Sequence, residues 1–328
     1  MTMEPLSTPA EILSVHDLIM EIDVDRRTMP VVDGVSFAVP YRSCMGLVGE
    51  SGSGKSLTCL SVLQLLPSNA RIASGRVLFR GEEVLKMTPG QLQVLRGRRI
   101  ALIPQDPQAA LNPVLTVERQ VSAPLTVHGF KGNVRNRVLE LLRLVRLPDP
   151  RSMLGRYPHQ LSGGMRQRVV WAMALACGPE LLVADEPMTA LDPTLQLQFV
   201  DLLADLKEEL GLSVIFVTHD FGLVRMLCDQ VAVMYAGRIV EYGPIEQVIE
   251  QPMHPYTRAL LAAVPALAGS KHRLTTIPGS PPTLGAFGVG CRFVARCPSA
   301  MDRCHKEYPP LRLHSNRMVA CWLNETES

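Results

Sequence analysis

The sequence predicts an α/β fold built on a mostly parallel β-sheet, and three observations support this. Residues 44–48, 181–184 and 214–217 are short apolar runs, which are typical of strands buried on both faces of a parallel sheet. Segments with the apolar spacing of amphipathic helices alternate with these runs, as in strand–helix–strand units. The composition, with 47% hydrophobic and 20% charged residues, is that of a chain that can bury a large core.

The first elements surround a glycine-rich loop. Residues 12 to about 40 contain short β-like stretches, of which 31–39 is the clearest. The apolar run at 44–48 leads into a loop rich in glycine and serine, and residues 56–66 then have helical spacing up to Pro67. We therefore expect a strand, a loop and a helix in direct succession.

The later elements divide into a helical region and a terminal segment. Apolar residues recur with helical spacing at 134–147 and 195–210, and residues from about 106 to 178 are predicted to be mainly helical. We expect 12–250 to form the principal domain, with 106–178 as a helical subdomain. After residue 250 prolines interrupt the periodic pattern, so 251–328 is predicted to be an appended C-terminal extension that contains proline and cysteine.

The charge and hydropathy of the chain indicate whether it binds nucleic acid or spans a membrane. Its 33 basic and 31 acidic residues leave a net charge of +2, which argues against nucleic acid because phosphate binding usually needs a basic excess. No apolar run approaches the roughly 18 residues of a membrane-spanning helix, and the N-terminus lacks the pattern of a signal peptide. We expect a cytoplasmic protein whose contact with a membrane is made through a partner.

The loop at residues 49–56 matches the phosphate-binding pattern G-x-x-x-x-G-K-[ST]. Its glycines allow backbone N–H groups to turn toward phosphate oxygens, and the N-terminus of the following helix adds a partial positive charge. We expect the side chain of Lys55 to reach the β- and γ-phosphates and the hydroxyl of Ser56 to bind Mg²⁺. A simple glycine-rich turn is the alternative. The predicted nucleotide-binding residues of this phosphate loop are Gly49, Glu50, Ser51, Gly52, Ser53, Gly54, Lys55 and Ser56.

An acidic pair follows the apolar run at 181–184. Asp185 and Glu186 lie where the predicted strand ends, which is where ligands bind in open α/β sheets. In that position Asp185 would hold Mg²⁺, and Glu186 would act as general base for the attacking water. Taken alone, the pair could equally be an ordinary acidic turn.

A second predicted anion site lies about twenty residues before the acidic pair. Two glycines after a serine leave backbone N–H groups exposed at the N-terminus of a helix. A chain with one phosphate loop does not need a second cradle for its own nucleotide, whereas each chain of a head-to-tail dimer could close the site of the other. An ordinary capped helix is the alternative. The residues of this second motif are Leu161, Ser162, Gly163 and Gly164.

In this order and spacing, the three motifs resemble those of the nucleotide-binding subunits of ABC transporters, across residues 12–250. The resemblance implies the fold of an ABC-cassette P-loop NTPase that hydrolyses ATP with Mg²⁺. It implies that Gln105 contacts Mg²⁺ and the membrane partner, that Asp192 belongs to the D-loop of the nucleotide site, and that His219 contacts the γ-phosphate. One position departs from the pattern, because Ile22 stands where the family usually stacks an aromatic side chain on adenine.

A narrower resemblance involves three further segments. Residues 105–113, 254–261 and 277–282 are similar to segments of the ATPases of oligopeptide, dipeptide and nickel importers. It implies a peripheral subunit on the cytoplasmic face of the inner membrane that energises the import of peptides or related solutes. Its partners would be two transmembrane permeases, a second and distinct ABC ATPase and, indirectly, an extracytoplasmic substrate-binding protein.

Three alternatives stay open at this point. The chain could be a soluble ABC ATPase of translation or DNA repair, although such chains usually carry two cassettes or a long coiled-coil insertion, and this sequence has neither. It could be a regulatory module that does not hydrolyse ATP, although Glu186 and His219 favour hydrolysis. The transported solute could be a nickel chelate or another small molecule, because selectivity resides in the permeases and the binding protein.

The eight cysteines are unevenly distributed. Four are scattered, at 44, 59, 177 and 228, and four are concentrated near the C-terminus, where five, six and sixteen residues separate them. Structural zinc usually uses shorter spacings, so a [4Fe–4S] cluster is the preferred prediction, with Zn²⁺ or free thiols as alternatives. The segment also resembles the cysteine-containing tail of the peptide-importer ATPases, and nothing in the sequence places it next to the ATP site. The four predicted ligands are Cys291, Cys297, Cys304 and Cys321.

Overall fold

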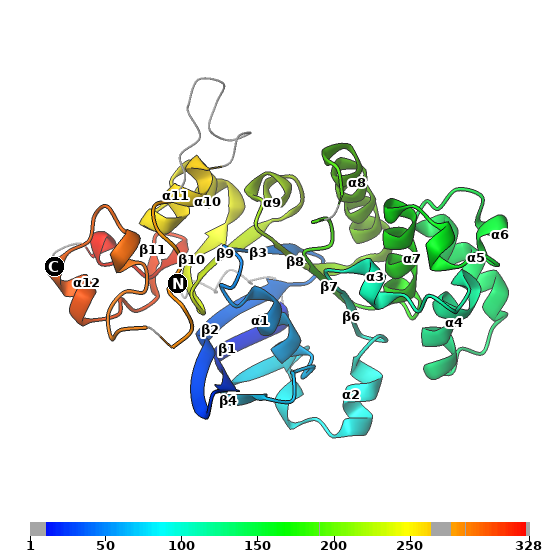
Figure 1. Cartoon of the computed structure of the whole chain (residues 1–328), viewed down its shortest axis with the longest axis horizontal. Coiled ribbons are helices and arrows are strands. Elements are labelled where there is room, and N and C mark those ends of the chain that lie inside the picture. The colour runs from blue at the N-terminus through cyan, green and yellow to red at the C-terminus, as the bar shows by residue number, and fades with distance from the viewer. Residues whose placement is uncertain (1–10, 190, 264–276, 286, 326–328) are drawn as a thin grey trace, which may run out of the picture. The chain divides into compact units, whose positions relative to one another are not determined.

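The computed structural model describes residues 11–189, 191–263, 277–285 and 287–325 (Figure 1). They fall into two compact units. The first contains Val39–Ser43 and Lys86–Ile215, and the second contains Leu13–Ala38, Cys44–Leu85 and the chain from Phe216 onward. Of the helices in the described ranges, none is both long enough and apolar enough to cross a bilayer.

The second unit includes an antiparallel sheet with the strand order β2-β1-β4-β5. Along β1, residues 12–15 are all buried, so both faces of this part of the strand are covered. The predicted β structure in residues 12–40 is therefore confirmed. The four strands are β1 (Glu11–Val24), β2 (Arg27–Pro40), β4 (Ala70–Phe79) and β5 (Glu82–Glu83).

A second sheet of the same unit carries the strand that precedes the phosphate loop. Its order is β11-β12-β10-β9-β3-β8, with β3 parallel to β9, and β10 antiparallel to both β9 and β12. β3 is buried along its whole length, as predicted for a central strand. The strands are β3 (Cys44–Val48), β8 (Ser213–Thr218), which begins in the first unit, β9 (Gln230–Tyr235), β10 (Arg238–Pro244), β11 (Arg312–His314) and β12 (Arg317–Val319).

The helices of the second unit are short. The helix predicted at 56–66 is confirmed but ends at Val62, and the backbone soon turns to the left-handed region at Gln64 (φ 50°). The C-terminal extension contributes helices and also the β11–β12 hairpin, which the proline-rich sequence did not predict. The helices are α1 (Lys55–Val62), α9 (Phe221–Leu227), α10 (Ile245–Glu250), α11 (Pro255–Ala262) and α12 (Asp302–Lys306), with 3₁₀ turns at Val84–Lys86, Val294–Arg296 and Trp322–Asn324.

β10 carries a buried carboxylate that the extension satisfies. Oε1 of Glu241 accepts the backbone N–H of Met253 and Oε2 accepts that of His254, both at 2.9 Å. The buried guanidinium of Arg317 lies 3.5 Å from Oε1. Donors that come from the extension thus balance the charge of a side chain with no exposed surface.

The first unit combines a parallel strand pair with a group of packed helices. Its strand order is β8-β7-β6, and β6 and β7 are parallel. Helices α4, α5 and α7 pack against one another, and the buried ring of Trp171 on α7 lies 5.2 Å from that of Phe199 on α8. The elements are β6 (Ile100–Ile103), β7 (Leu181–Asp185), α2 (Pro89–Leu95), α3 (Pro107–Ala110), α4 (Val117–Val127), α5 (Val134–Leu144), α6 (Pro150–Met153), α7 (Gly163–Leu175), α8 (Pro193–Leu210) and a 3₁₀ turn at Pro158–Gln160.

The helical prediction for residues 106–178 is confirmed, because only helices, turns and irregular segments occur between these fully described positions. The amphipathic helices predicted at 134–147 and 195–210 correspond to α5 and α8. The boundaries proposed for the domains, at 12–250, 106–178 and 251–328, stay predictions.

Candidate functional site

The phosphate loop links β3 to α1 in the second unit. Its backbone requires glycine, because φ is 78° at Gly52 and 102° at Gly54, and a Cβ at Gly49 would lie 2.1 Å from the carbonyl oxygen of Met234. Gly54 is the N-cap of α1 and provides no side-chain hydrogen bond to the first turn, which also lacks acidic residues. The N–H groups at this helix end are therefore suited to an anionic ligand.

Two side chains of the loop fit a bound polyphosphate. The buried ammonium of Lys55 donates to the carbonyl oxygens of Gly49 (2.9 Å) and Glu50 (3.0 Å), so it lies over the loop. The hydroxyl of Ser53 is buried and has no hydrogen-bond partner among the described residues. Buried hydroxyls without partners are uncommon, so Ser53 and Lys55 both offer donors to a bound anion, and the role of the loop as a phosphate site stays a prediction.

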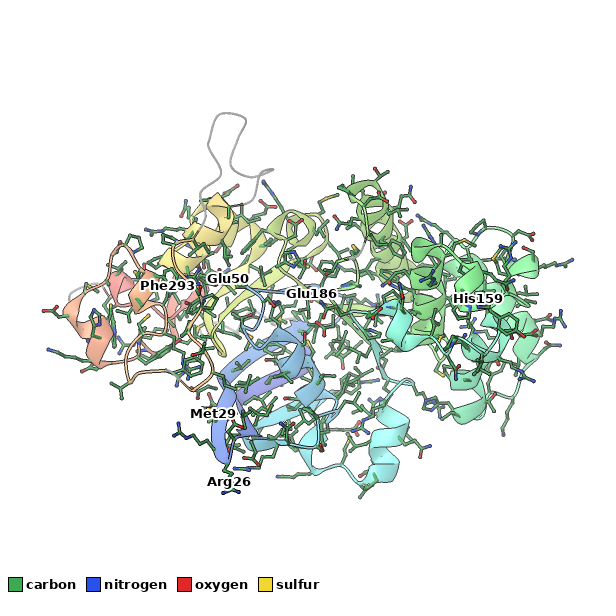
Figure 2. The ribbon with its side chains drawn as sticks, viewed as in Figure 1. Arg26, Met29, Glu50, His159, Glu186 and Phe293 are labelled. Atoms are coloured by element: carbon green, nitrogen blue, oxygen red, sulfur yellow. The ribbon has the colours of Figure 1, made fainter. Side chains whose placement is uncertain are left out.

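The acidic pair lies at the end of β7 in the first unit. Asp185 is buried, and Glu186, labelled in Figure 2, follows it. The backbone φ of Glu186 is 43°, which is rare for a residue other than glycine. The Oε2 atom of Glu186 accepts the amide N–H of Gln105 at 3.3 Å and the hydroxyl of Thr189 at 3.0 Å. The structure thus brings Gln105 and Glu186 together, and it adds Thr189, which the sequence analysis missed.

The second predicted anion site forms the N-terminus of α7 in the first unit. The hydroxyl of Ser162 accepts the N–H of Met165 at 3.3 Å, so this serine caps its own helix. A Cβ at Gly163 would meet nothing within 4 Å, and one at Gly164 would make only ordinary contacts with Leu195. Packing within the described chain therefore does not explain why these two positions are glycine. The close approach of another molecule to this surface would explain it.

The remaining predicted residues lie at element ends. Asp192, in the first unit, is the N-cap of α8 and accepts the N–H of Leu195 at 3.0 Å. His219, in the second unit, is exposed directly after β8. The predicted residues of the first unit are Gln105, Leu161, Ser162, Gly163, Gly164, Asp185, Glu186 and Asp192, and those of the second are the phosphate loop, His219 and the four cysteines.

Glu50 of the phosphate loop is held by residues of the C-terminal extension. Its carboxylate accepts two hydrogen bonds from Arg296, at 2.7 and 2.9 Å, and its backbone N–H donates to the hydroxyl of Tyr256 at 2.9 Å. The hydrogen bonds to Glu50 raise the pKa of Arg296, which is buried. The extension therefore contacts the predicted phosphate loop, a link that no sequence motif indicated.

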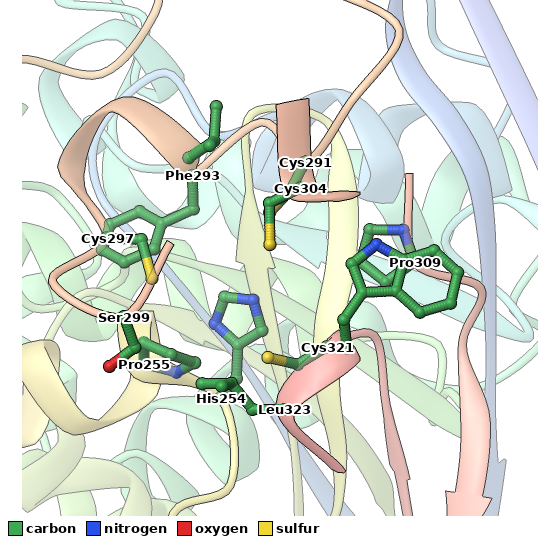
Figure 3. Close-up of a pocket in the computed structure, with 12 residues that line it drawn as sticks. His254, Pro255, Cys291, Phe293, Cys297, Ser299, Cys304, Pro309, Cys321 and Leu323 are labelled. Carbon is green, nitrogen blue, oxygen red and sulfur yellow. The ribbon is translucent and has the colours of Figure 1, made fainter. Parts of the chain in front are cut away.

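The four clustered cysteines line one apolar pocket together with His254 (Figure 3). Burial raises the pKa of Cys291 to about 11 and lowers that of His254 to about 3, so neither is charged near neutral pH. Among the described residues, however, no three His, Cys, Asp or Glu side chains are grouped closely enough to hold a metal ion. The four cysteines line the same pocket, and their role as metal ligands stays a prediction.

Known families match both parts of the chain. The ABC transporter family matches residues 32–189, and the family described as oligopeptide/dipeptide transporter, C-terminal region, matches residues 240–304. The probable peptide ABC transporter ATP-binding protein y4tR of Sinorhizobium fredii is 46% identical over 95% of this chain and 94% of its own length. The dipeptide transport ATP-binding protein DppD of Bacillus subtilis is 44% identical over 96% of this chain and 95% of its own length.

A solved structure matches the cassette. The dimeric bacterial ABC transporter cassette MJ0796 is similar over 71% of this chain and 98% of its own, with 26% sequence identity and a TM-score of 0.64. Another structure of MJ0796 is a dimer in a post-hydrolysis state with bound ADP and phosphate. The fold, the motifs and the identity over nearly the full length lead to one conclusion: the chain belongs to the ATP-binding subunits of the ABC transporter family and carries their oligopeptide/dipeptide C-terminal region.

Proposed function

We propose that this chain hydrolyses ATP to drive the import of peptides, with Glu186 as the general base. The observation that carries the catalytic part is the environment of Glu186, whose carboxylate is oriented by Gln105 and Thr189 at the end of a buried strand. A base must be held in one direction to accept a proton from the attacking water. The peptide specificity rests on the C-terminal family match and on the relatives named for peptide and dipeptide transport.

The other predicted residues would bind the phosphates and Mg²⁺. The N–H groups at the start of α1 and the ammonium of Lys55 would bind the phosphates, and His219 would contact the γ-phosphate. Ser56, Gln105 and Asp185 supply the oxygen ligands that suit Mg²⁺. When bound, Mg²⁺ neutralises the charge that develops on the phosphate oxygens.

We further propose that the N-terminus of α7 serves the nucleotide of a second ATPase subunit. Its glycines have no packing role within the described chain, and the similar cassette MJ0796 is a dimer. Leu161, Ser162, Gly163, Gly164 and Asp192 would then act across the subunit interface. The pair would attach to two permeases on the cytoplasmic face of the inner membrane and receive substrate indirectly from an extracytoplasmic binding protein, without any nucleic-acid partner.

We also propose that the cysteine pocket holds a [4Fe–4S] cluster, with Zn²⁺ as the alternative. All four cysteines line one apolar pocket, and Fe–S clusters are held by four thiolates. Among the described residues no three of these side chains are grouped closely enough to hold a metal ion, so binding requires the cysteines to move closer together. Iron, labile-sulfide and zinc analysis of anaerobically purified protein tests it. We expect iron and sulfide in about fourfold molar amounts and a brown colour. A colourless protein with neither element would exclude the cluster, and stoichiometric zinc would select the alternative.

The transport function is tested by uptake of labelled di- and oligopeptides into vesicles that contain the assembled transporter and external binding protein. We expect uptake that requires ATP on the cytoplasmic side and that Glu186→Gln abolishes. Uptake of a nickel chelate instead of peptides would replace the substrate class. ATP hydrolysis that no permease stimulates, with no uptake of any solute, would favour a soluble ABC ATPase.

A further inference from the structure

Glu50, labelled in Figure 2, joins the phosphate loop to the C-terminal extension through its backbone N–H and its carboxylate. The N–H donates to Tyr256 and the carboxylate accepts both hydrogen bonds from Arg296, whereas the carbonyl oxygen accepts from Lys55 within the loop. The peptide between Gly49 and Glu50 is therefore fixed on both sides, because the Gly49 oxygen also accepts from Lys55 at 2.9 Å. The same contacts that orient this peptide also place the Lys55 ammonium.

Arg296 is itself held in one orientation. Its side chain is only 5% exposed, and besides Glu50 it donates to the carbonyl of Pro278 at 2.9 Å and to the hydroxyl of Tyr235 at 3.3 Å. A two-pronged pair between a guanidinium and a carboxylate defines both direction and distance. Since four hydrogen bonds to three separate segments orient the guanidinium, the pair can set the position of Glu50 and not merely neutralise its charge.

Tyr256 is equally constrained. It is fully buried on α11, with ring centres 4.5 Å from Tyr235 and 5.4 Å from Phe293. Phe293 also lines the cysteine pocket, and Arg296 directly precedes Cys297. The Arg296 contact to Glu50 therefore comes from residues 291–297, which carry the first two clustered cysteines, whereas the Tyr256 contact comes from α11.

We propose that Arg296 and Tyr256 are positioning residues for ATP binding, which hold the phosphate loop through Glu50 in the geometry that binds the nucleotide. A loop that is already ordered loses less conformational entropy when it binds phosphate. The extension thus contributes to the affinity for ATP although it supplies no contact to the phosphates. The inference rests on the proposed role of the phosphate loop, which Lys55→Ala tests separately.

The experiment measures the Kd of the full chain for ATP-Mg²⁺ by calorimetry, and KM and kcat of the assembled transporter, well below the melting temperature of each variant. We expect Arg296→Gln and Glu50→Gln each to raise Kd and KM about fivefold to tenfold, with kcat at saturating ATP within about twofold of wild type. Because both residues act through one contact, the double variant should be no weaker than either single one. Tyr256→Phe should raise Kd by a smaller factor, since it removes one neutral acceptor.

Arg317→Gln is the matched control. Arg317 is also a buried arginine of the extension paired with a glutamate, but its partner Glu241 lies on β10 and not in the phosphate loop. We expect this variant to lower Tm while leaving the Kd for ATP unchanged. An unchanged Kd in Arg296→Gln, an additive double variant, or an equal loss of affinity in Arg317→Gln would each overturn the inference. If Lys55→Ala also binds ATP normally, the proposed role of the loop fails instead.

Discussion

At the scale of single residues, Glu186 combines a rare backbone conformation with a carboxylate held by two donors. Glu186→Gln keeps the size of the side chain but removes its basicity, so we expect ATP to bind normally and turnover to fall at least about 10²-fold. Phosphate release and ATP binding, measured on the same assembled transporter, check this. If Glu186→Gln turns over ATP at a rate close to that of wild type, Glu186 is not the general base.

Thr189 offers a second test at the same scale. Its hydroxyl lies 3.0 Å from Oε2 of Glu186 and 3.2 Å from the Glu186 carbonyl oxygen. Thr189→Val has the same shape but cannot donate, so we expect kcat to fall about tenfold to 10²-fold, which corresponds to the roughly 1.5–3 kcal/mol of one hydrogen bond to a charged group. Thr189→Ser should restore most of the rate. If Val and Ser variants behave alike, the hydroxyl has no part in orienting the base.

The predicted residues of the phosphate loop and of the acidic pair share one property, which is that each belongs to a short contiguous motif. Lys55 and Glu186 could be recognised because the loop or strand that positions them is adjacent in sequence. Arg296 could not, because its partner Glu50 lies 246 positions away and nothing local marks the pair. Thr189 had a weak signal, since a hydroxyl three residues after an acid can reach back to it.

At the scale of elements, a substitution at the N-terminus of α7 should affect ATP turnover without lowering stability. A side chain at Gly163 meets open space in the described chain, and replacing glycine in a helix gains about 0.5–1 kcal/mol. We therefore expect Gly163→Gln to leave Tm unchanged or raise it, while ATP turnover of the assembled transporter falls about tenfold or more. Thermal unfolding and phosphate release check the two halves. Wild-type turnover would show that no partner nucleotide approaches this helix.

Elements with a strong apolar pattern were predictable, and short polar ones were not. β3 and β7 are continuous apolar runs, and α5 and α8 have an apolar face, so periodicity identified all four. β11 and β12 have only three residues each and contain arginine, histidine and methionine, so they carry no alternating pattern. Their pairing depends on β10, which lies about seventy residues earlier in the chain.

At the scale of the whole molecule, ATP hydrolysis should depend on assembly. If the second anion site serves another subunit, an isolated chain lacks part of its own nucleotide site. We expect the purified chain to hydrolyse ATP slowly, with a rate per chain that rises with protein concentration and rises further with permeases and the second ATPase. Measurements of specific activity across a concentration series check this. Full activity of a monomer, independent of concentration, would contradict it.

The buried carboxylate on β10 has a consequence for how these chains diverge. The donors to Glu241 found among the described residues all come from Met253, His254 and Arg317. Loss of the extension would leave the buried carboxylate of Glu241 without donors, which would lower the free energy of unfolding by about 3–5 kcal/mol. An acid at this position and the extension should therefore be inherited together, so cassettes that end near residue 250 should carry a neutral residue here. The residue at position 241 would then show, for each member of the family, whether the extension has been gained or lost.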